Sequence, residues 1–127
     1  MDELIMERFK QINREGFKNQ GKIEQADVVA DGEGCRGSGD HLFLYLKIEE
    51  GRIVNIKYKC AYCDPAMFVT AEILCDRVRG LSINEIPKID KKDFSNFLGE
   101  YSQEVIEHST PALEILRKAI ENYKDNI

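Results

Sequence analysis

Two cysteines in a C-x-x-C arrangement, Cys60 and Cys63, carry the most distinctive chemistry of this chain. They follow an alternating stretch that predicts a β-strand, and they precede Asp64-Pro65, a pair typical of a helix start. The thiolate is the reactive form of cysteine, and a helix N-terminus lowers the pKa of a cysteine beside it. A sulfur pair between a strand and a helix is therefore suited to metal binding or to redox chemistry.

Three further candidate ligands lie at the ends of predicted elements. Cys35 lies in a loop with four glycines among residues 31–39, Asp40 follows that loop, and His108 precedes the predicted last helix. The two ends of an antiparallel hairpin are neighbours, so we expect Asp40 to lie close to the C-x-x-C pair. These residue types bind zinc and, with cysteine dominant, iron–sulfur clusters. The sequence predicts one metal centre there, with five candidate ligands: Cys35, Cys60, Cys63, Asp40 and His108.

Packing roles compete with ligand roles for some of these residues. Cys75 follows Leu74 on a predicted helix and is interpreted as a packing residue, and His41 is interpreted as a solvated strand end. Cys60 could be a small core residue, because a period of two places it on one apolar face with three others: Val54, Ile56 and Tyr58.

A β-hairpin is the element that must position the sulfur pair. Apolar residues alternate over 42–48 and again over 54–59, and Glu49-Glu50-Gly51 supplies the turn between them. A weaker extended pattern over 23–30 predicts a first strand. The glycine-rich residues 31–39 are expected to form no regular element.

Helices are predicted on both sides of the hairpin. Apolar spacing predicts a helix over 2–13, and Pro65 and Gly80 bound another over 65–79. Ser82 opens a capping box for a short helix that Pro87 ends. The C-terminal part is expected to hold three helical segments: 90–98, 101–107 and 111–124, the last with Thr110 as its N-cap and Pro111 as its first residue.

Composition limits the class of protein. The 127 residues suit a single domain, 1–127, with 43% hydrophobic and 32% charged residues. A net charge of −5 argues against a nucleic-acid partner, and no apolar run is long enough for a membrane span. The start Met1-Asp2-Glu3-Leu4 lacks the pattern of a signal peptide, so the expected location is the cytoplasm. In that reducing compartment clustered cysteines more often bind metal or do redox work than form structural disulfides.

Several segments follow one another across nearly the whole chain in a characteristic order: Lys18–Asp27, the glycine loop, Gly39-Asp40, the hairpin, Cys63 and Ala112–Ile120. In this order they resemble the NifU N-terminal/IscU-type iron–sulfur cluster assembly scaffolds. The resemblance implies an α+β fold, in which a three-stranded antiparallel sheet has helices packed on one face. It also implies a scaffold or carrier rather than an enzyme, which holds an iron–sulfur cluster or zinc. The implied partners are a cysteine desulfurase or other sulfur donor and recipient apoproteins, and a homodimer when cluster-loaded is compatible with it.

The chain departs from the family pattern at its ligand positions. The family's Cys-Gly-Asp reads Ser38-Gly39-Asp40 here, so Cys35 is expected to take over the role of that cysteine. The second family cysteine matches Cys63, and the third family cysteine falls on His108. Cys60 has no counterpart in the family pattern and is an addition.

Two alternatives to a scaffold remain open at the level of sequence. The chain could be a zinc-binding interaction module of the same fold, or a thiol redox protein that uses Cys60 and Cys63 alone. Against the redox alternative, the strand before the C-x-x-C belongs to a hairpin rather than to the βαβ unit of thioredoxin-like proteins.

Overall fold

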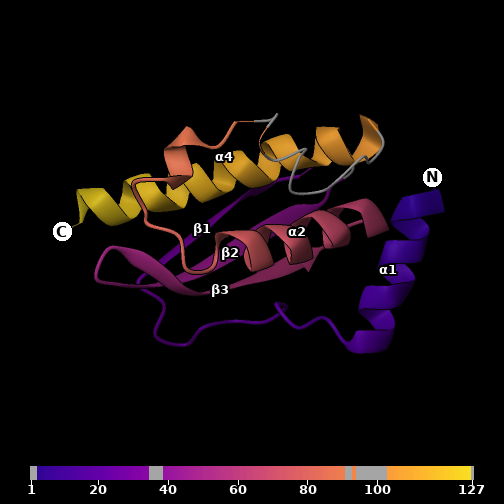
Figure 1. The fold of residues 1–127 in the computed structure, drawn as a ribbon, viewed down its shortest axis with the longest axis horizontal. Helices are drawn as coiled ribbons and strands as arrows, with labels where there is room; N and C mark the ends of the chain where they lie inside the picture. The colour runs from indigo at the N-terminus through magenta and orange to yellow at the C-terminus, as the bar shows by residue number, and fades with distance from the viewer. Residues whose placement is uncertain (1–2, 35–38, 91–92, 94–102, 127) are drawn as a thin grey trace.

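The computed structural model describes residues 3–34, 39–90, 93 and 103–126. Its centre is an antiparallel sheet of order β1-β2-β3, formed by β1 (Val28–Glu33), β2 (His41–Glu49) and β3 (Arg52–Ala61). Helices α2 (Pro65–Val78) and α4 (Gln103–Asp125) lie over the same face of the sheet (Figure 1), and they contact each other above it. The predicted α+β fold with helices on one face is confirmed.

The hairpin has the alternation that its sequence predicts. Four residues of β2, Leu42, Leu44, Leu46 and Ile48, are buried under the helices, whereas the residues between them are only partly covered. The strands turn through Glu50 and Gly51, with φ angles of 52° and 73°. Two successive left-handed residues match the twist of a tight hairpin, and glycine adopts this conformation at little cost.

A β-bulge shifts the alternation of β3. Lys47 pairs with Asn55 but Ile48 pairs with Ile53, so Val54 has no partner in the register. As a result Ile53 is fully buried and Val54 is 42% exposed. The expectation that Val54 shares a face with Cys60 is therefore wrong, because one inserted residue reverses the side-chain phase. Beyond the bulge Ile56 and Tyr58 are buried, as expected.

The first strand lies further along the chain than predicted. It spans Val28–Glu33 rather than 23–30, so three residues assigned to the glycine loop belong to the sheet. Gly32 pairs with Leu42, and a β-carbon on Gly32 would lie 3.0 Å from Cγ1 of Ile115 in α4. The glycine therefore allows close packing of α4 on β1, which the local pattern does not reveal.

The C-terminal helix is longer than predicted. Helix α4 runs without a break from Gln103 to Asp125 and contains Pro111, so Thr110 is not an N-cap and His108 lies within a helix rather than in a loop. A proline inside a helix costs about 3 kcal/mol through a lost hydrogen bond and a clash. Residues that follow it are buried against the sheet and α2, and their burial offsets this cost: Ala112, Leu113, Ile115, Leu116, Ala119 and Ile120.

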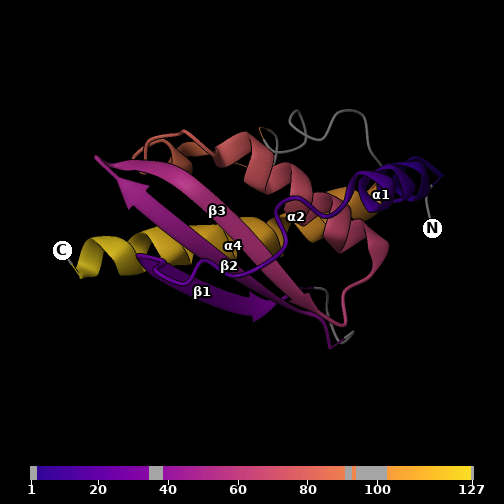
Figure 2. The ribbon, with the colours of Figure 1, turned by 90° about the horizontal axis from the view of Figure 1, so that it is seen from below.

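The remaining helical predictions had mixed outcomes. Helix α1 (Glu3–Glu15) and helix α2 occur where expected, and α1 packs on α2 (Figure 2). The capping box at Ser82 opens no α-helix; turns lead instead to a 3-10 turn, η1 (Ile86–Lys88), which contains Pro87. The prediction for 90–98 lies largely outside the described residues, whereas the predicted helical stretch 101–107 is helical from residue 103 onward and forms the first part of α4.

A buried polar cluster fastens the chain after α1 to helix α2. The backbone N–H of Asn19 donates to the Glu72 carboxylate at 3.3 Å, and the Asn19 side chain donates to the Glu72 carbonyl oxygen at 3.2 Å. Arg79 donates to Oδ1 of Asn19 at 2.6 Å and to the carbonyl oxygen of Ile56 at 2.9 Å. The backbone N–H of Tyr58 in turn donates to the carbonyl oxygen of Asn19 at 2.9 Å. This segment therefore covers the outer edge of β3, which leads to the C-x-x-C pair.

Glu72 makes the stability of this cluster depend on pH. Its burial is the main cause that raises the pKa of its carboxyl group above the ordinary value of 4.5. The free energy of unfolding should fall as pH rises from 4.5 through the raised pKa, because the folded state then holds a buried charge. Urea unfolding at a series of pH values should show a smaller fall in the free energy of unfolding for Glu72→Gln than for the parent protein. Parallel pH profiles for the two proteins would contradict this assignment.

Candidate functional site

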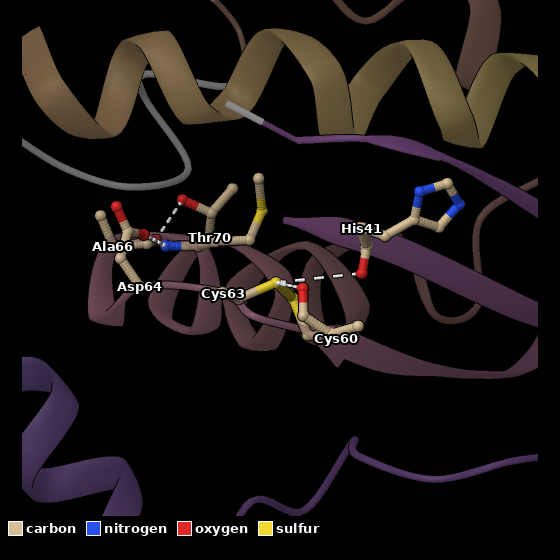
Figure 3. The surroundings of a disulfide bond; sticks show 8 residues. His41, Cys60, Cys63, Asp64, Ala66 and Thr70 are labelled. Carbon is tan, nitrogen blue, oxygen red and sulfur yellow. Dashed lines mark hydrogen bonds between the residues drawn. A yellow bond between two sulfur atoms is a disulfide. The ribbon is translucent and has the colours of Figure 1, made fainter. Parts of the chain in front are cut away.

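The two sulfurs of the C-x-x-C pair meet at the open end of the hairpin. Cys60 is the penultimate residue of β3 and pairs with the buried Leu42 of β2, whereas Cys63 lies in the connection to α2. A disulfide joins them, with 5.8 Å between their Cα atoms (Figure 3). The structure thus brings together two of the five predicted ligands directly.

A left-handed residue closes the turn between the cysteines. Tyr62 has a φ of 57° and is 89% exposed. This conformation costs a side-chain-bearing residue about 1–2 kcal/mol, and nothing in the burial of Tyr62 offsets it. Strain of this kind is typical of functional sites. Tyr62 also places a large aromatic ring in solvent beside the sulfur pair.

Helix α2 begins immediately after Cys63. Asp64 is the N-cap, because its Oδ1 accepts a hydrogen bond from the backbone N–H of Met67 at 2.9 Å (Figure 3). Pro65 occupies the first helical turn, where its missing N–H costs nothing. The sequence predicts this start correctly. It places Cys63 beside the positive end of the helix dipole, where negative charge is stabilised.

The start of β2 supplies main-chain atoms to the sulfur pair. Sγ of Cys63 lies 4.0 Å from the carbonyl oxygen of His41 and 3.7 Å from that of Ala61, and these two residues pair across the sheet. The His41 ring points away from the sulfurs (Figure 3). It contacts Asp31, with 2.6 Å between Nε2 and Oδ2, and packs on Phe43.

Asp40 precedes His41 and is almost fully buried, with 2% of its surface exposed. A β-carbon on Gly34 would lie 2.2 Å from Oδ2 of Asp40 and 2.8 Å from Cε of Met67 in α2. The Asp40 carboxylate therefore occupies the space that the missing side chain of Gly34 leaves beside α2. The backbone N–H of Gly34 also donates to the carbonyl oxygen of Asp40 at 3.2 Å. The sequence pattern does not reveal this role of Gly34, whose only signal is its place in a glycine-rich loop.

The described residues give only part of the predicted metal centre. Cys35 and Ser38 lie outside the described residues, and of His108 only its position in α4 is described. Among the side chains that the structure does describe, no three His, Cys, Asp or Glu residues are grouped as a metal site. Asp40 and the C-x-x-C pair nonetheless lie at the same end of the hairpin, as expected, because Ala61 pairs with His41.

Cys75 takes no part in this site. It is a free thiol with no exposed surface, in the C-terminal half of α2, and burial is the main cause that raises the pKa of this thiol. A thiol held protonated in an apolar core is a poor nucleophile and metal ligand. The interpretation of Cys75 as a packing residue is confirmed.

Comparison with known proteins identifies the family. The chain is 32% identical over 106 residues to "Iron-sulfur cluster assembly scaffold protein IscU 1" of Archaeoglobus fulgidus, a match that covers 84% of this chain and 68% of that protein. It is also 32% identical over 114 residues to "Nitrogen fixation protein NifU" of Nostoc sp., where the match again covers 84% of this chain but spans only 38% of the relative.

A solved structure shares the fold of this chain. The crystal structure of a NifU-like protein (N-terminal) from Brucella abortus superposes with a TM-score of 0.73 over 99% of this chain and 95% of that chain, at 11% identity. Within the described parts of this chain, none of the helices combines the length and apolar character that crossing a bilayer requires. The model described as "NifU-like N terminal domain" matches residues 2–127, and the chain therefore belongs to the NifU-like N-terminal domain family.

Proposed function

We propose that this protein is an iron–sulfur cluster assembly scaffold, which receives iron and sulfide, holds the nascent cluster at the end of the hairpin and passes it to recipient apoproteins. The observation that carries the proposal is the meeting of the Cys60 and Cys63 sulfurs at the end of the hairpin where the buried Asp40 immediately precedes β2. The printed names of the relatives support it, since the Archaeoglobus protein is called a cluster assembly scaffold. In this role the chain is a carrier rather than a catalyst.

The proposed ligands are those that the sequence predicts. Cys63 and Cys60 supply soft sulfur donors once their disulfide is reduced, and Asp40 supplies a carboxylate. Cys35 and His108 complete the set of Cys35, Cys60, Cys63, Asp40 and His108. The cluster, or zinc in its place, is cargo, and the proposed partners are a sulfur donor such as a cysteine desulfurase, a recipient apoprotein and, in the loaded state, a second copy of the chain.

A thiol redox function is the second candidate, because the structure contains a C-x-x-C disulfide with a strained residue inside its turn. Anaerobic reconstitution of the reduced protein with iron and sulfide separates the candidates. A scaffold should gain visible absorption and pass the cluster to an added apo iron–sulfur protein. A zinc-binding module should stay colourless with zinc bound, and a pure redox protein should bind neither metal and exchange disulfides instead.

Cys63→Ser should reduce iron or cluster binding by at least about tenfold, the scale at which a metal site responds to the loss of a supporting group. The fold should persist, because Cys63 lies outside the strands and helices. Bound iron after reconstitution and circular dichroism would measure the two effects. Cys75→Ala is the matched control and should bind as the parent does, since Cys75 is buried in α2. Equal binding by Cys63→Ser and the parent would refute the site.

Asp40→Ala should slow cluster transfer to an apo iron–sulfur acceptor severalfold. A carboxylate is a harder and more exchangeable partner for iron than a thiolate, so its loss removes the ligand that is most readily released. The rate of acceptor maturation, measured with clusters preformed on each variant, tests this expectation. Faster release from Asp40→Ala would show that Asp40 does not promote transfer.

Gly34→Ala should destabilise the fold by about 1–3 kcal/mol, because its β-carbon would overlap the Asp40 carboxylate and Met67. Cluster binding should fall with it if Asp40 is displaced. The same substitution in an Asp40→Ala background should cost less, since its closest clash is gone. Urea unfolding of the four proteins in this cycle provides the measurement, and identical costs in the two backgrounds would argue against contact between the two residues.

A further inference from the structure

We propose that Cys60 is a resolving thiol, which attacks a persulfide carried on Cys63 and releases its outer sulfur as sulfide. This inference rests on the proposed scaffold function and extends it, because it assigns a source to the sulfide of the cluster. The substrate is sulfane sulfur delivered as a persulfide, and the product is hydrosulfide. Cys60 therefore has a role of its own besides metal ligation.

The oxidation states create the need for such a step. Sulfur in an iron–sulfur cluster is sulfide, whereas the outer sulfur of a persulfide is formally two electrons more oxidised. Two thiols supply two electrons when they become a disulfide. A C-x-x-C pair therefore carries the number of electrons that converts one sulfane sulfur atom into one sulfide ion.

The observed disulfide is the product of this step. The bond between Cys60 and Cys63 shows that the Cys60 sulfur reaches Sγ of Cys63, which would be the inner sulfur of a persulfide. Cys60 is held in the sheet opposite the buried Leu42, while Cys63 lies in the connection beyond the strand. The fixed position of the attacking sulfur converts the reaction into an intramolecular one, which is strongly accelerated relative to attack by a free thiol.

The turn between the cysteines favours this pairing. Tyr62 holds a left-handed φ of 57° within the turn that brings Cys60 and Cys63 to a Cα separation of 5.8 Å. Cys75 cannot substitute for Cys60, because it is completely buried within α2. Among the described residues, Cys60 is therefore the thiol that is placed to resolve a group on Cys63.

Each step balances in atoms and electrons. The Cys63 thiolate first attacks the outer sulfur of a donor persulfide, which leaves the donor as a thiolate and gives Cys63–Sγ–SH. The Cys60 thiolate then attacks Sγ of Cys63, the Sγ–SH bond breaks, and the outer sulfur leaves as HS⁻ with the bonding electron pair. The product is the Cys60–Cys63 disulfide. A dithiol reductant returns both cysteines to thiols by disulfide exchange and is itself oxidised to a disulfide.

The test uses the full chain without metal. The protein is reduced, freed of reductant and treated anaerobically with a limiting amount of glutathione persulfide, and sulfide is measured together with the intact mass and the peptide map. The parent protein should release one sulfide for each disulfide formed between Cys60 and Cys63. Cys60→Ser should instead retain one extra sulfur atom on Cys63 and release sulfide at least about tenfold more slowly.

Two further variants complete the experiment. Cys63→Ser should form neither the persulfide at this site nor the disulfide, and Cys75→Ala should behave as the parent does. The inference is overturned if Cys60→Ser releases sulfide as fast as the parent, or if the parent accumulates a stable persulfide without a disulfide. Reconstitution of the reduced parent with iron and ready-made sulfide bypasses this step. Failure of that reconstitution would therefore count against the scaffold function, whereas the role of Cys60 in sulfide release would still be decided by the persulfide experiment.

Discussion

Antiparallel pairing of β2 with β3 is the interaction on which the rest of the site depends. It sets Leu42 opposite Cys60 and His41 opposite Ala61, so the chain just before β2 and the chain just after β3 must lie together. A slip of one residue would turn Cys60 to the other face of the sheet and separate it from the position of Cys63. The buried stripe of β2 prevents this slip, because each fully buried leucine contributes about 1.5–3 kcal/mol.

Helix α2 positions the residues beside the hairpin, Cys63 and Asp40, through helix capping and close packing. Asp64 caps α2 and so determines where the connection from β3 ends, while Gly34 leaves room for the Asp40 carboxylate beside the same helix. The polar cluster of Asn19, Glu72 and Arg79 ties the outer edge of β3 to α2. A buried carboxylate is costly unless it accepts hydrogen bonds, and the two donors of Asn19 reduce that cost. The strand that carries Cys60 is thus held from the core side and from its edge.

The parts of this arrangement that sequence can predict are those encoded locally. The hairpin and the start of α2 follow from alternation, Glu50-Gly51 and Asp64-Pro65, all of which act over a few neighbouring residues. The bulge at Val54 depends on the partner strand, and the continuity of α4 through Pro111 depends on burial against the sheet, so local rules misjudge both. The contact between Gly34 and Asp40 depends likewise on the packing of α2. The spacing of the cysteine pair predicts metal or redox chemistry, whereas its disulfide is a property of the folded turn.

The sulfur pair has two proposed uses, to hold a cluster and to release sulfide from a persulfide. One molecule cannot do both at the same time. A disulfide sulfur carries no thiolate, so the chain that has just released sulfide cannot bind iron through Cys60 or Cys63. Reduction by a dithiol must come between sulfide release and cluster holding, and the reductant therefore controls the order of events. Tyr62 is 89% exposed, so the turn between the two cysteines lies at the surface of the protein, where a reductant can approach it.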